Sequence, residues 1–199
     1  MPDYSEEKKL VAAGALRIAG IDEVGRGPLA GPVVAAAVIL DRDSIPEGLN
    51  DSKKLTAKTR EALFDKIQDR AHVSIASASV EEIDTLNILY ASHLAMERAL
   101  AGLESVDHAL VDGNMIPAGI TCPATPMIKG DGRSVSIAAA SIMAKVTRDR
   151  LMVDLAQQCP GYGWERNAGY PTKEHRDALN RLGVTPHHRR SFRTVHNML

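Results

Sequence analysis

The sequence of 199 residues has little cysteine, few aromatic residues and no long run of apolar side chains. Two cysteines, Cys122 and Cys159, are too few for a disulfide framework or a cysteine-rich zinc site, so we expect reduced thiols. No apolar stretch approaches the ~18 residues of a membrane helix, and the polar N-terminus lacks the apolar core of a signal peptide. We therefore expect a cytoplasmic protein without a membrane partner.

A dominant charge is also missing, because the formal net charge is −1. Overall attraction to nucleic acid is therefore not expected, and any such binding must come from local basic stretches. Two candidates are Lys53-Lys54 and the segment 187–193, His-His-Arg-Arg-Ser-Phe-Arg. The length suits one domain, or one domain with a small appendage, and we expect a monomer.

The hydrophobic pattern predicts strands interleaved with helices, which indicates a mixed α/β sandwich. Apolar or alternating runs predict strands at 16–21, 32–40, 72–78, 108–111 and 127–130. Helical periodicity and capping residues predict helices at 56–70, 80–103 with a break near Asn87, 135–158 and 172–182.

Asp22 and Glu23 stand at the end of the first apolar strand, just before Gly25-Arg26-Gly27. In a regular strand two adjacent side chains point to opposite faces, so both acids reach one metal cluster only if the strand ends or bulges at Glu23. The glycines permit such a bend and let backbone amides approach a sugar or phosphate, while Arg26 offers a forked donor to a phosphate. The glycine spacing fits neither a Walker A loop nor a dinucleotide fingerprint.

Two further acids, Asp112 and Asp131, repeat this placement, each after a predicted strand and beside glycine. Asp-Gly is a common turn dipeptide, so neither residue alone is informative, but the set of four is. Phosphoryl hydrolysis by two Mg²⁺ or Mn²⁺ ions roughly 4 Å apart needs three or four carboxylates at strand ends. The seven histidines show no paired zinc-hydrolase spacing, and Asp149 is better explained by ion pairing on the long helix.

Six sequence blocks occur together in an order that resembles bacterial ribonuclease HII. They are Asp22-Glu23-Val24-Gly25-Arg26-Gly27, Asp51-Ser52-Lys53-Lys54-Leu55, Val111-Asp112-Gly113, Lys129-Gly130-Asp131, the segment 136–145 (SIAAASIMAK) and Gly169-Tyr170-Pro171-Thr172. The resemblance extends from about residue 16 to the end of the chain.

The resemblance implies an RNase H-like fold, which is a mixed five-stranded sheet flanked by helices, with a C-terminal helical extension. It divides the chain into a polar lead (1–15), a catalytic core (16–158) and an extension (159–199) that completes the substrate site. The related ribonuclease HIII carries a sizeable N-terminal domain, which the short lead here disfavours.

The resemblance also implies the chemistry. The family's acidic set falls on Asp22, Glu23, Asp112 and Asp131, which would serve as catalytic residues and as ligands of two Mn²⁺ or Mg²⁺ ions. The substrates implied are the RNA strand of an RNA/DNA hybrid and a single ribonucleotide in duplex DNA, cut on its 5′ side. The products carry 5′-phosphate and 3′-hydroxyl ends.

Nucleic-acid contacts are implied for six residues. The backbone of Gly25, Arg26 and Gly27 resembles the family element that reads the 2′-hydroxyl, the group that distinguishes RNA from DNA. Tyr170 would stack on the adjacent deoxyribose, and Ser52 and Lys53 would contact phosphates. A sliding clamp is a possible partner, although the segment 194–199 shows no clear clamp-binding pattern.

Two other functions stay open. A hybrid-binding module without catalysis would be expected to lack at least one acid, and this chain keeps all four. Another nuclease of the same fold, such as an exonuclease or a junction resolvase, would lack the glycine-arginine-glycine element.

Overall fold

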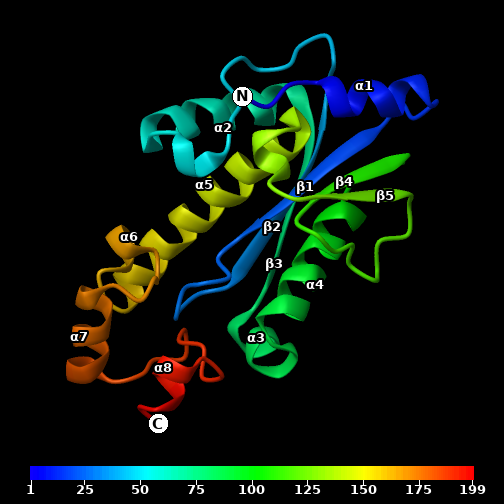
Figure 1. The fold of residues 1–199 in the computed structure, drawn as a ribbon. Coiled ribbons are helices and arrows are strands. Elements are labelled where there is room, and N and C mark those ends of the chain that lie inside the picture. Colours follow the sequence, from blue (N-terminus) through cyan, green and yellow to red (C-terminus); the bar gives the residue numbers. More distant parts are fainter.

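A single mixed sheet organises the structure, a computed structural model that describes all 199 residues (Figure 1). Its five strands lie in the order β3-β2-β1-β4-β5, and β1 pairs antiparallel with β2 and parallel with β4. The β2–β3 pair is antiparallel and the β4–β5 pair is parallel. The strands are β1 (Ile18–Val24), β2 (Val33–Leu40), β3 (Ala71–Ala78), β4 (His108–Asp112) and β5 (Ala124–Met127). This arrangement confirms the expected fold class.

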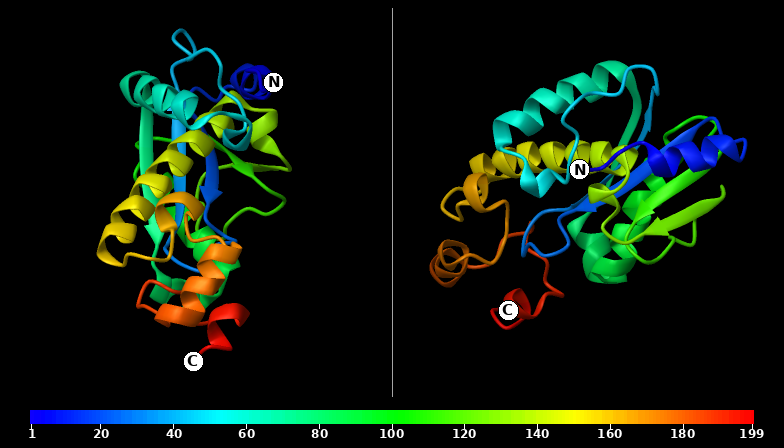
Figure 2. Two further views of the ribbon diagram at one scale, coloured as in Figure 1. Left: turned by 90° about the vertical axis from the view of Figure 1, so that its left-hand side faces the viewer. Right: turned by 45° about the horizontal axis from the view of Figure 1, so that its top comes forward.

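Helices cover both faces of the sheet, because β2 is fully buried and alternates between two cores. Val34, Ala36 and Val38 pack with α2 (Ala57–Arg70) and α5 (Val135–Gln158), whereas the odd-numbered residues of β2 pack with α3 (Val80–Leu86) and α4 (Ile88–Ala101). Figure 2 shows α5 and α4 on opposite sides of the sheet. Asn87 has a φ of 69° and accepts hydrogen bonds from the first amides of α4, so the predicted break is confirmed.

The sheet and a helix approach each other closely where α5 crosses β1. A Cβ atom on Gly20 would lie 2.1 Å from the carbonyl carbon of Ser136, closer than real Cβ contacts allow. Glycine is therefore required there, and the start of α5 lies directly over β1, the strand that carries Asp22 and Glu23.

The N-terminal segment, expected as a polar lead, contains a helix, α1 (Ser5–Ala12). Glu7 is fully buried, and its Oε1 accepts hydrogen bonds from the Ser134 hydroxyl at 2.5 Å and the Ser136 amide at 3.0 Å. The carboxylate thus binds free donors at the start of α5, where the helix dipole favours negative charge.

The C-terminal extension contains α6 (Trp164–Asn167), α7 (Lys173–Leu182) and α8 (Arg193–His196), and returns to the sheet. A third core that includes Trp164 and Leu179 joins it to the end of α5. The tail then pairs with the loop after β1, where Ala30 bridges His188 and the Arg189 amide donates to the Leu29 carbonyl at 2.8 Å.

One predicted strand is wrong. The segment 127–130 was expected to be extended, but β5 ends at Met127 and Gly130–Gly132 forms a short 3₁₀ turn. Lys129 has a φ of 55°, and this left-handed backbone cannot continue a strand. No helix qualifies as a transmembrane segment, including α5 with its 24 residues.

Candidate metal centre and nucleic-acid interface

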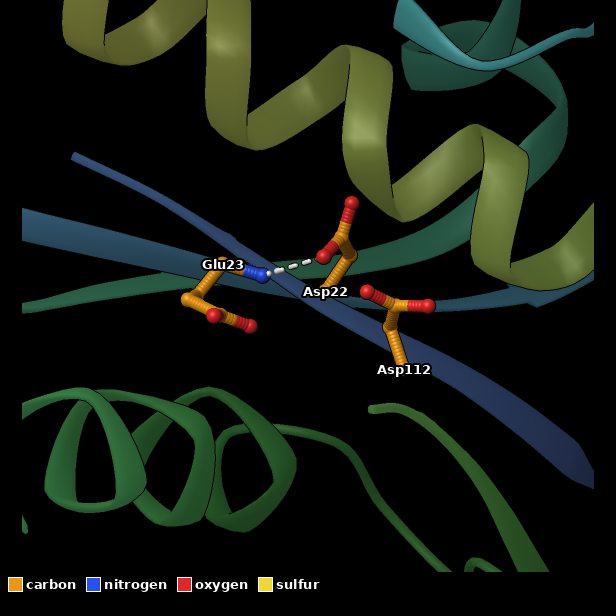
Figure 3. Close-up of side chains that lie close together, drawn as sticks. All are labelled: Asp22, Glu23 and Asp112. Carbon is orange, nitrogen blue, oxygen red and sulfur yellow. Dashed lines mark hydrogen bonds between the residues drawn. The ribbon is translucent and has the colours of Figure 1, made fainter. Parts of the chain in front are cut away.

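Three of the four predicted acids meet at the ends of β1 and β4. The parallel register pairs Ile21 with Val111, which places the next residues, Asp22 and Asp112, side by side. One carboxylate oxygen each of Asp22, Glu23 and Asp112 lies within 4.8 Å of the other two (Figure 3). Asp22 is only 6% exposed and points toward α5 in Figure 3, whereas Glu23 and Asp112 are partly exposed.

The expected strand end or bulge at Glu23 is wrong, because β1 continues in regular register to Val24, opposite Val34. Asp22 and Glu23 extend from opposite sides of the strand in Figure 3, yet both reach the cluster. The Asp22 carboxylate bends back to accept the Glu23 amide at 2.7 Å, and the longer glutamate side chain supplies the remaining reach. The turn comes later, at Gly25, whose φ is +100°.

Burial and the charges of neighbouring carboxylates oppose ionisation of Asp22 and Glu23. Burial raises the pKa of Asp22 well above its ordinary value, and the charges of Glu23 and Asp112 raise it further. Burial also raises the pKa of Glu23 to about 7, although Arg26 lowers it. A cluster that resists its own negative charge is suited to accept a cation.

Asp131 joins the site through a cleft of about 630 Å³ that Asp112 also lines. The Gly130 amide donates to Asp112 Oδ1 at 2.7 Å and so holds the turn that carries Asp131 beside β4. Burial is the largest of the effects that raise the pKa of Asp131, followed by the negative charges of Asp51 and Asp112. The fourth acid therefore lies at the edge of the cluster, outside the group of three.

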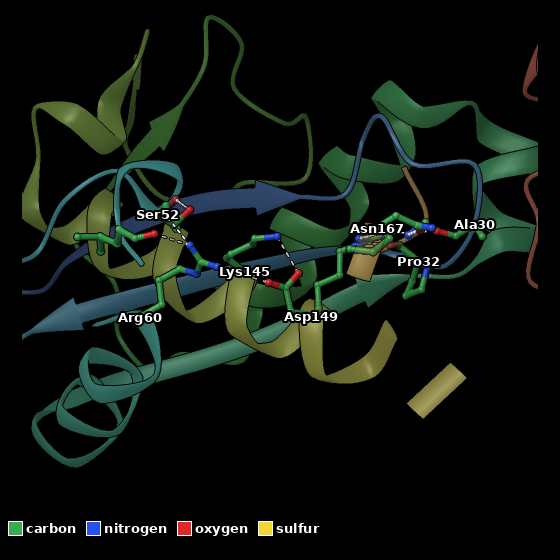
Figure 4. Close-up of polar contacts among 12 residues, drawn as sticks. Ala30, Pro32, Ser52, Arg60, Lys145, Asp149 and Asn167 are labelled. Carbon is green, nitrogen blue, oxygen red and sulfur yellow. Dashed lines mark hydrogen bonds and ion pairs between the residues drawn. The ribbon is translucent and has the colours of Figure 1, made fainter. Parts of the chain in front are cut away.

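Ser52 and Lys53 lie in a 3₁₀ turn, Ser52–Lys54, at this cleft. Lys53 is exposed and faces the cleft. Ser52 was expected to contact a phosphate, but it is 4% exposed and its hydroxyl is bonded to the Ser141 hydroxyl at 2.9 Å. Its carbonyl accepts Arg60 Nη1 at 3.0 Å, so in this structure Ser52 fixes the turn (Figure 4).

Asp149 forms the ion pairing expected on the long helix. Lys145, one turn before it on α5, lies 2.7 Å from its carboxylate, and Arg60 approaches from α2 at 3.9 Å (Figure 4). These pairs explain Asp149 without a metal.

The glycine-arginine-glycine loop lies between the acids and the extension. The Arg26 side chain is half exposed, and its Nη1 lies 3.4 Å from Glu23 Oε1. A Cβ atom built on Gly27 would lie 3.4 Å from Cε1 of Tyr170, so the tyrosine ring lies over this glycine. Tyr170 is 38% exposed, which leaves part of the ring free for a ligand.

Sequence reasoning missed four residues of the site. Asp51 lines the cleft, and Ser141 bonds Ser52 and lowers the pKa of Asp22. Arg148 and Arg189 are fully buried behind the glycine-arginine-glycine loop. Asp51 and Ser141 stand inside blocks that carry the family resemblance, whereas Arg148 looks like a surface charge in the sequence. Arg189 belongs to the basic segment 187–193, a candidate for nucleic-acid binding, but its side chain is buried and turned inward.

The donor set at the cluster fits a divalent cation. Carboxylate oxygens are the ligands that Mg²⁺ and Mn²⁺ prefer, and the described residues bring no histidine or cysteine into the cluster. The only cationic side chain that forms an ion pair with one of these three acids is the half-exposed Arg26, which lies 3.4 Å from Glu23.

Comparison with known proteins agrees with the motifs and the fold. The family model for ribonuclease HII matches residues 19–195. The ribonuclease HII of Ruegeria pomeroyi is 74% identical over 100% of this chain and 85% of its own length. That of Paracoccus denitrificans is 64% identical over 100% of this chain and 95% of its own length.

Solved structures show the same fold. The ribonuclease H2 of Pyrococcus horikoshii OT3 superposes with a TM-score of 0.77 at 30% identity, covering 92% of this chain and 97% of that one. The ribonuclease HII of Archaeoglobus fulgidus, solved as a complex with PCNA, also gives 0.77, at 28% identity over 87% and 94% of the two chains. The chain therefore belongs to the ribonuclease HII family of metal-dependent endoribonucleases, which act on RNA/DNA hybrids.

Proposed function

We propose that this protein cuts the RNA strand of RNA/DNA hybrids and also cuts duplex DNA on the 5′ side of a single embedded ribonucleotide, using two divalent ions. The observation that carries the proposal is the approach of Asp22, Glu23 and Asp112 to within 4.8 Å, beside a glycine loop with free amides. In this proposal the acids bind the catalytic ions, and the loop amides recognise the 2′-hydroxyl of the ribonucleotide.

In this proposal Asp22, Glu23 and Asp112 hold the ions, Mn²⁺ or Mg²⁺, and Asp131 completes the set from the cleft. When bound, such ions activate water for attack on phosphorus and stabilise the departing 3′ oxygen. The Gly130 amide holds Asp112 Oδ1, and the Glu23 amide holds Asp22 Oδ1, so two of the carboxylates are oriented in advance.

Cationic side chains flank the acids and favour a phosphate backbone. Lys53, Lys54, Lys129 and Arg133 line the cleft beside Asp112 and Asp131, although the net charge of the protein is only −1. Arg26, in the loop after β1, lies 3.4 Å from Glu23. Local positive charge around the acidic cluster compensates for its repulsion of the substrate.

Recognition of the ribonucleotide is assigned to the loop and to the C-terminal extension. The Arg26 and Gly27 amides donate to no backbone group, so both can bind a 2′-hydroxyl. The Tyr170 ring lies over Gly27 and would stack on the neighbouring deoxyribose. Because Tyr170 comes from residues 159–199, this extension completes the substrate site.

The test is cleavage of a labelled DNA duplex that carries one ribonucleotide, compared with an all-DNA duplex and a uniform RNA/DNA hybrid. Each is incubated with Mn²⁺, with Mg²⁺ or with chelator. We expect a metal-dependent cut on the 5′ side of the ribonucleotide and none in the all-DNA duplex. Cleavage of the hybrid alone would remove the role of the loop at a single ribonucleotide, and cleavage of neither would favour a binding module.

A further inference from the structure

A buried guanidinium group forms hydrogen bonds to the inner side of the glycine-arginine-glycine loop. Arg189, in the C-terminal tail, donates to the carbonyls of Gly25 at 2.6 Å, Arg26 at 3.1 Å and Gly31 at 2.9 Å. Its exposed fraction is 0%. One side chain of the extension therefore binds both peptide groups at the centre of the loop.

A second buried arginine continues this contact along the loop. Arg148, on α5, donates to the carbonyls of Ala30 at 3.0 Å, Pro32 at 2.9 Å and Ala168 at 2.9 Å. Figure 4 shows Ala30 and Pro32 close together beside α5. The path from Gly25 to Pro32 is thus held by two fixed cations and has no regular strand or helix of its own.

The direction of these bonds decides where the loop amides point. In a planar trans peptide the C=O of one residue and the N–H of the next point in opposite directions. Arg189 holds the Gly25 and Arg26 carbonyls inward, so the amides of Arg26 and Gly27 point away from the guanidinium group. Neither amide donates to another backbone group, and both are therefore presented to a ligand.

The buried cations have no carboxylate partner within ion-pair distance. Burying a charge is costly, and apolar side chains often fill such a site with equal or greater stability. The tail is already anchored independently, because Asp84 accepts the Arg190 amide at 3.0 Å and the Ser191 amide at 2.9 Å. A role in stability alone does not explain a buried guanidinium group that binds three carbonyls.

We propose that Arg189 is a positioning residue for substrate specificity: by fixing the Gly25 and Arg26 carbonyls it aims the loop amides at the 2′-hydroxyl of a single ribonucleotide. The inference rests on the proposed function of the loop. A uniform hybrid offers a 2′-hydroxyl at every nucleotide, so a displaced loop still finds one. A lone ribonucleotide offers one position, and its cleavage depends more strongly on Arg189.

The test compares Arg189→Ala, Arg189→Lys and a control, Leu179→Ala. Lysine keeps the charge but lacks the planar fork that binds three carbonyls. Leu179 is 1% exposed in the core of the extension, so its truncation loosens the same region without touching the loop carbonyls. For each variant, kcat/KM is measured on the duplex with one ribonucleotide and on the uniform hybrid, and the ratio is compared with that of the unsubstituted enzyme.

We expect kcat/KM on the single ribonucleotide to fall about 100-fold in both Arg189 variants, the loss typical of small displacements of positioning groups, and to fall about tenfold or less on the hybrid. Leu179→Ala should lower both values by the same factor. Millimolar methylguanidinium should restore part of the ratio in Arg189→Ala, because it can refill the vacated space. If Arg189→Ala does not fold, Arg189→Lys decides the matter.

An unchanged ratio in Arg189→Lys, or the same change in Leu179→Ala, would overturn this inference while the proposed function stands. Failure of the unsubstituted enzyme to cut at the single ribonucleotide would instead overturn the proposed function, and this inference with it.

Discussion

Glu23→Gln should stabilise the metal-free protein at pH 8. The pKa of Glu23 is raised from 4.5 to about 7 in the folded state, mainly by burial. The folded protein therefore holds this proton more tightly than the unfolded chain, and the group's contribution to stability is lost as pH rises from 4.5 to 7. At about 1.36 kcal/mol per pH unit, ionised Glu23 costs about 3 kcal/mol above pH 7, a cost that glutamine avoids.

The assay is urea unfolding with chelator at pH 4 and pH 8. The variant should exceed the unsubstituted protein by about 3 kcal/mol at pH 8 and should match it at pH 4, where both side chains are neutral. Glu47→Gln, at an exposed position, is the control and should change stability by less than about 0.5 kcal/mol. With Mn²⁺ added at pH 8, the unsubstituted protein should become more stable to urea than Glu23→Gln, because the variant lacks one ligand of the ion. An equal difference at both pH values would refute the electrostatic reasoning.

Three further predictions concern the framework around the site. Burial lowers the pKa of His188 from 6.5 to about 4. The free energy of unfolding, measured in urea, should therefore be highest above pH 6.5 and should fall by about 2 kcal/mol by pH 5. His188→Gln should reduce this fall, and an unchanged fall would assign it to other groups. Gly20→Ala should lower the free energy of unfolding by about 3 kcal/mol or prevent folding, because its Cβ would lie 2.1 Å from a Ser136 backbone atom. The control Gly132→Ala, whose Cβ would meet nothing within 4 Å, should cost less than about 1 kcal/mol. Equal melting temperatures of the two variants would contradict the contact. Glu7→Ala should cost about 2 kcal/mol in thermal unfolding, because two donors at the start of α5 lose their acceptor, and an unchanged melting temperature would count against that role.

Local patterns predicted most of the fold. The break at Asn87 was visible because a helix cannot pass through a residue with positive φ, and asparagine both tolerates that conformation and caps the next helix. The segment 127–130 was predicted wrongly, because its apolar start resembles a strand and nothing in Lys129 signals a left-handed backbone. The helix α1 was missed because a polar segment reveals no buried partner, and its Glu7 contacts lie more than 120 residues away.

The sequence indicated the acidic residues of the candidate site but not the buried arginines that hold the neighbouring loop. Asp22, Glu23 and Asp112 could be singled out because they stand at the ends of apolar runs, near glycine, inside blocks that carry the family resemblance. The parallel pairing of β1 with β4 and the regular geometry of Glu23 were not expected. Arg148 and Arg189 could not be placed, because an arginine in a sequence is normally a surface charge and only the folded loop shows the carbonyls that it binds.

The measurement that most directly tests the acidic cluster as the catalytic centre is cleavage and binding by Asp22→Asn. Asparagine keeps the size of the side chain but removes a buried carboxylate from the group of three. We expect cleavage of both substrates in Mn²⁺ or Mg²⁺ to fall by about a thousandfold or more, because a ligand of the ions is lost, while hybrid affinity stays within about threefold. Full activity in Asp22→Asn would contradict the assignment of the site.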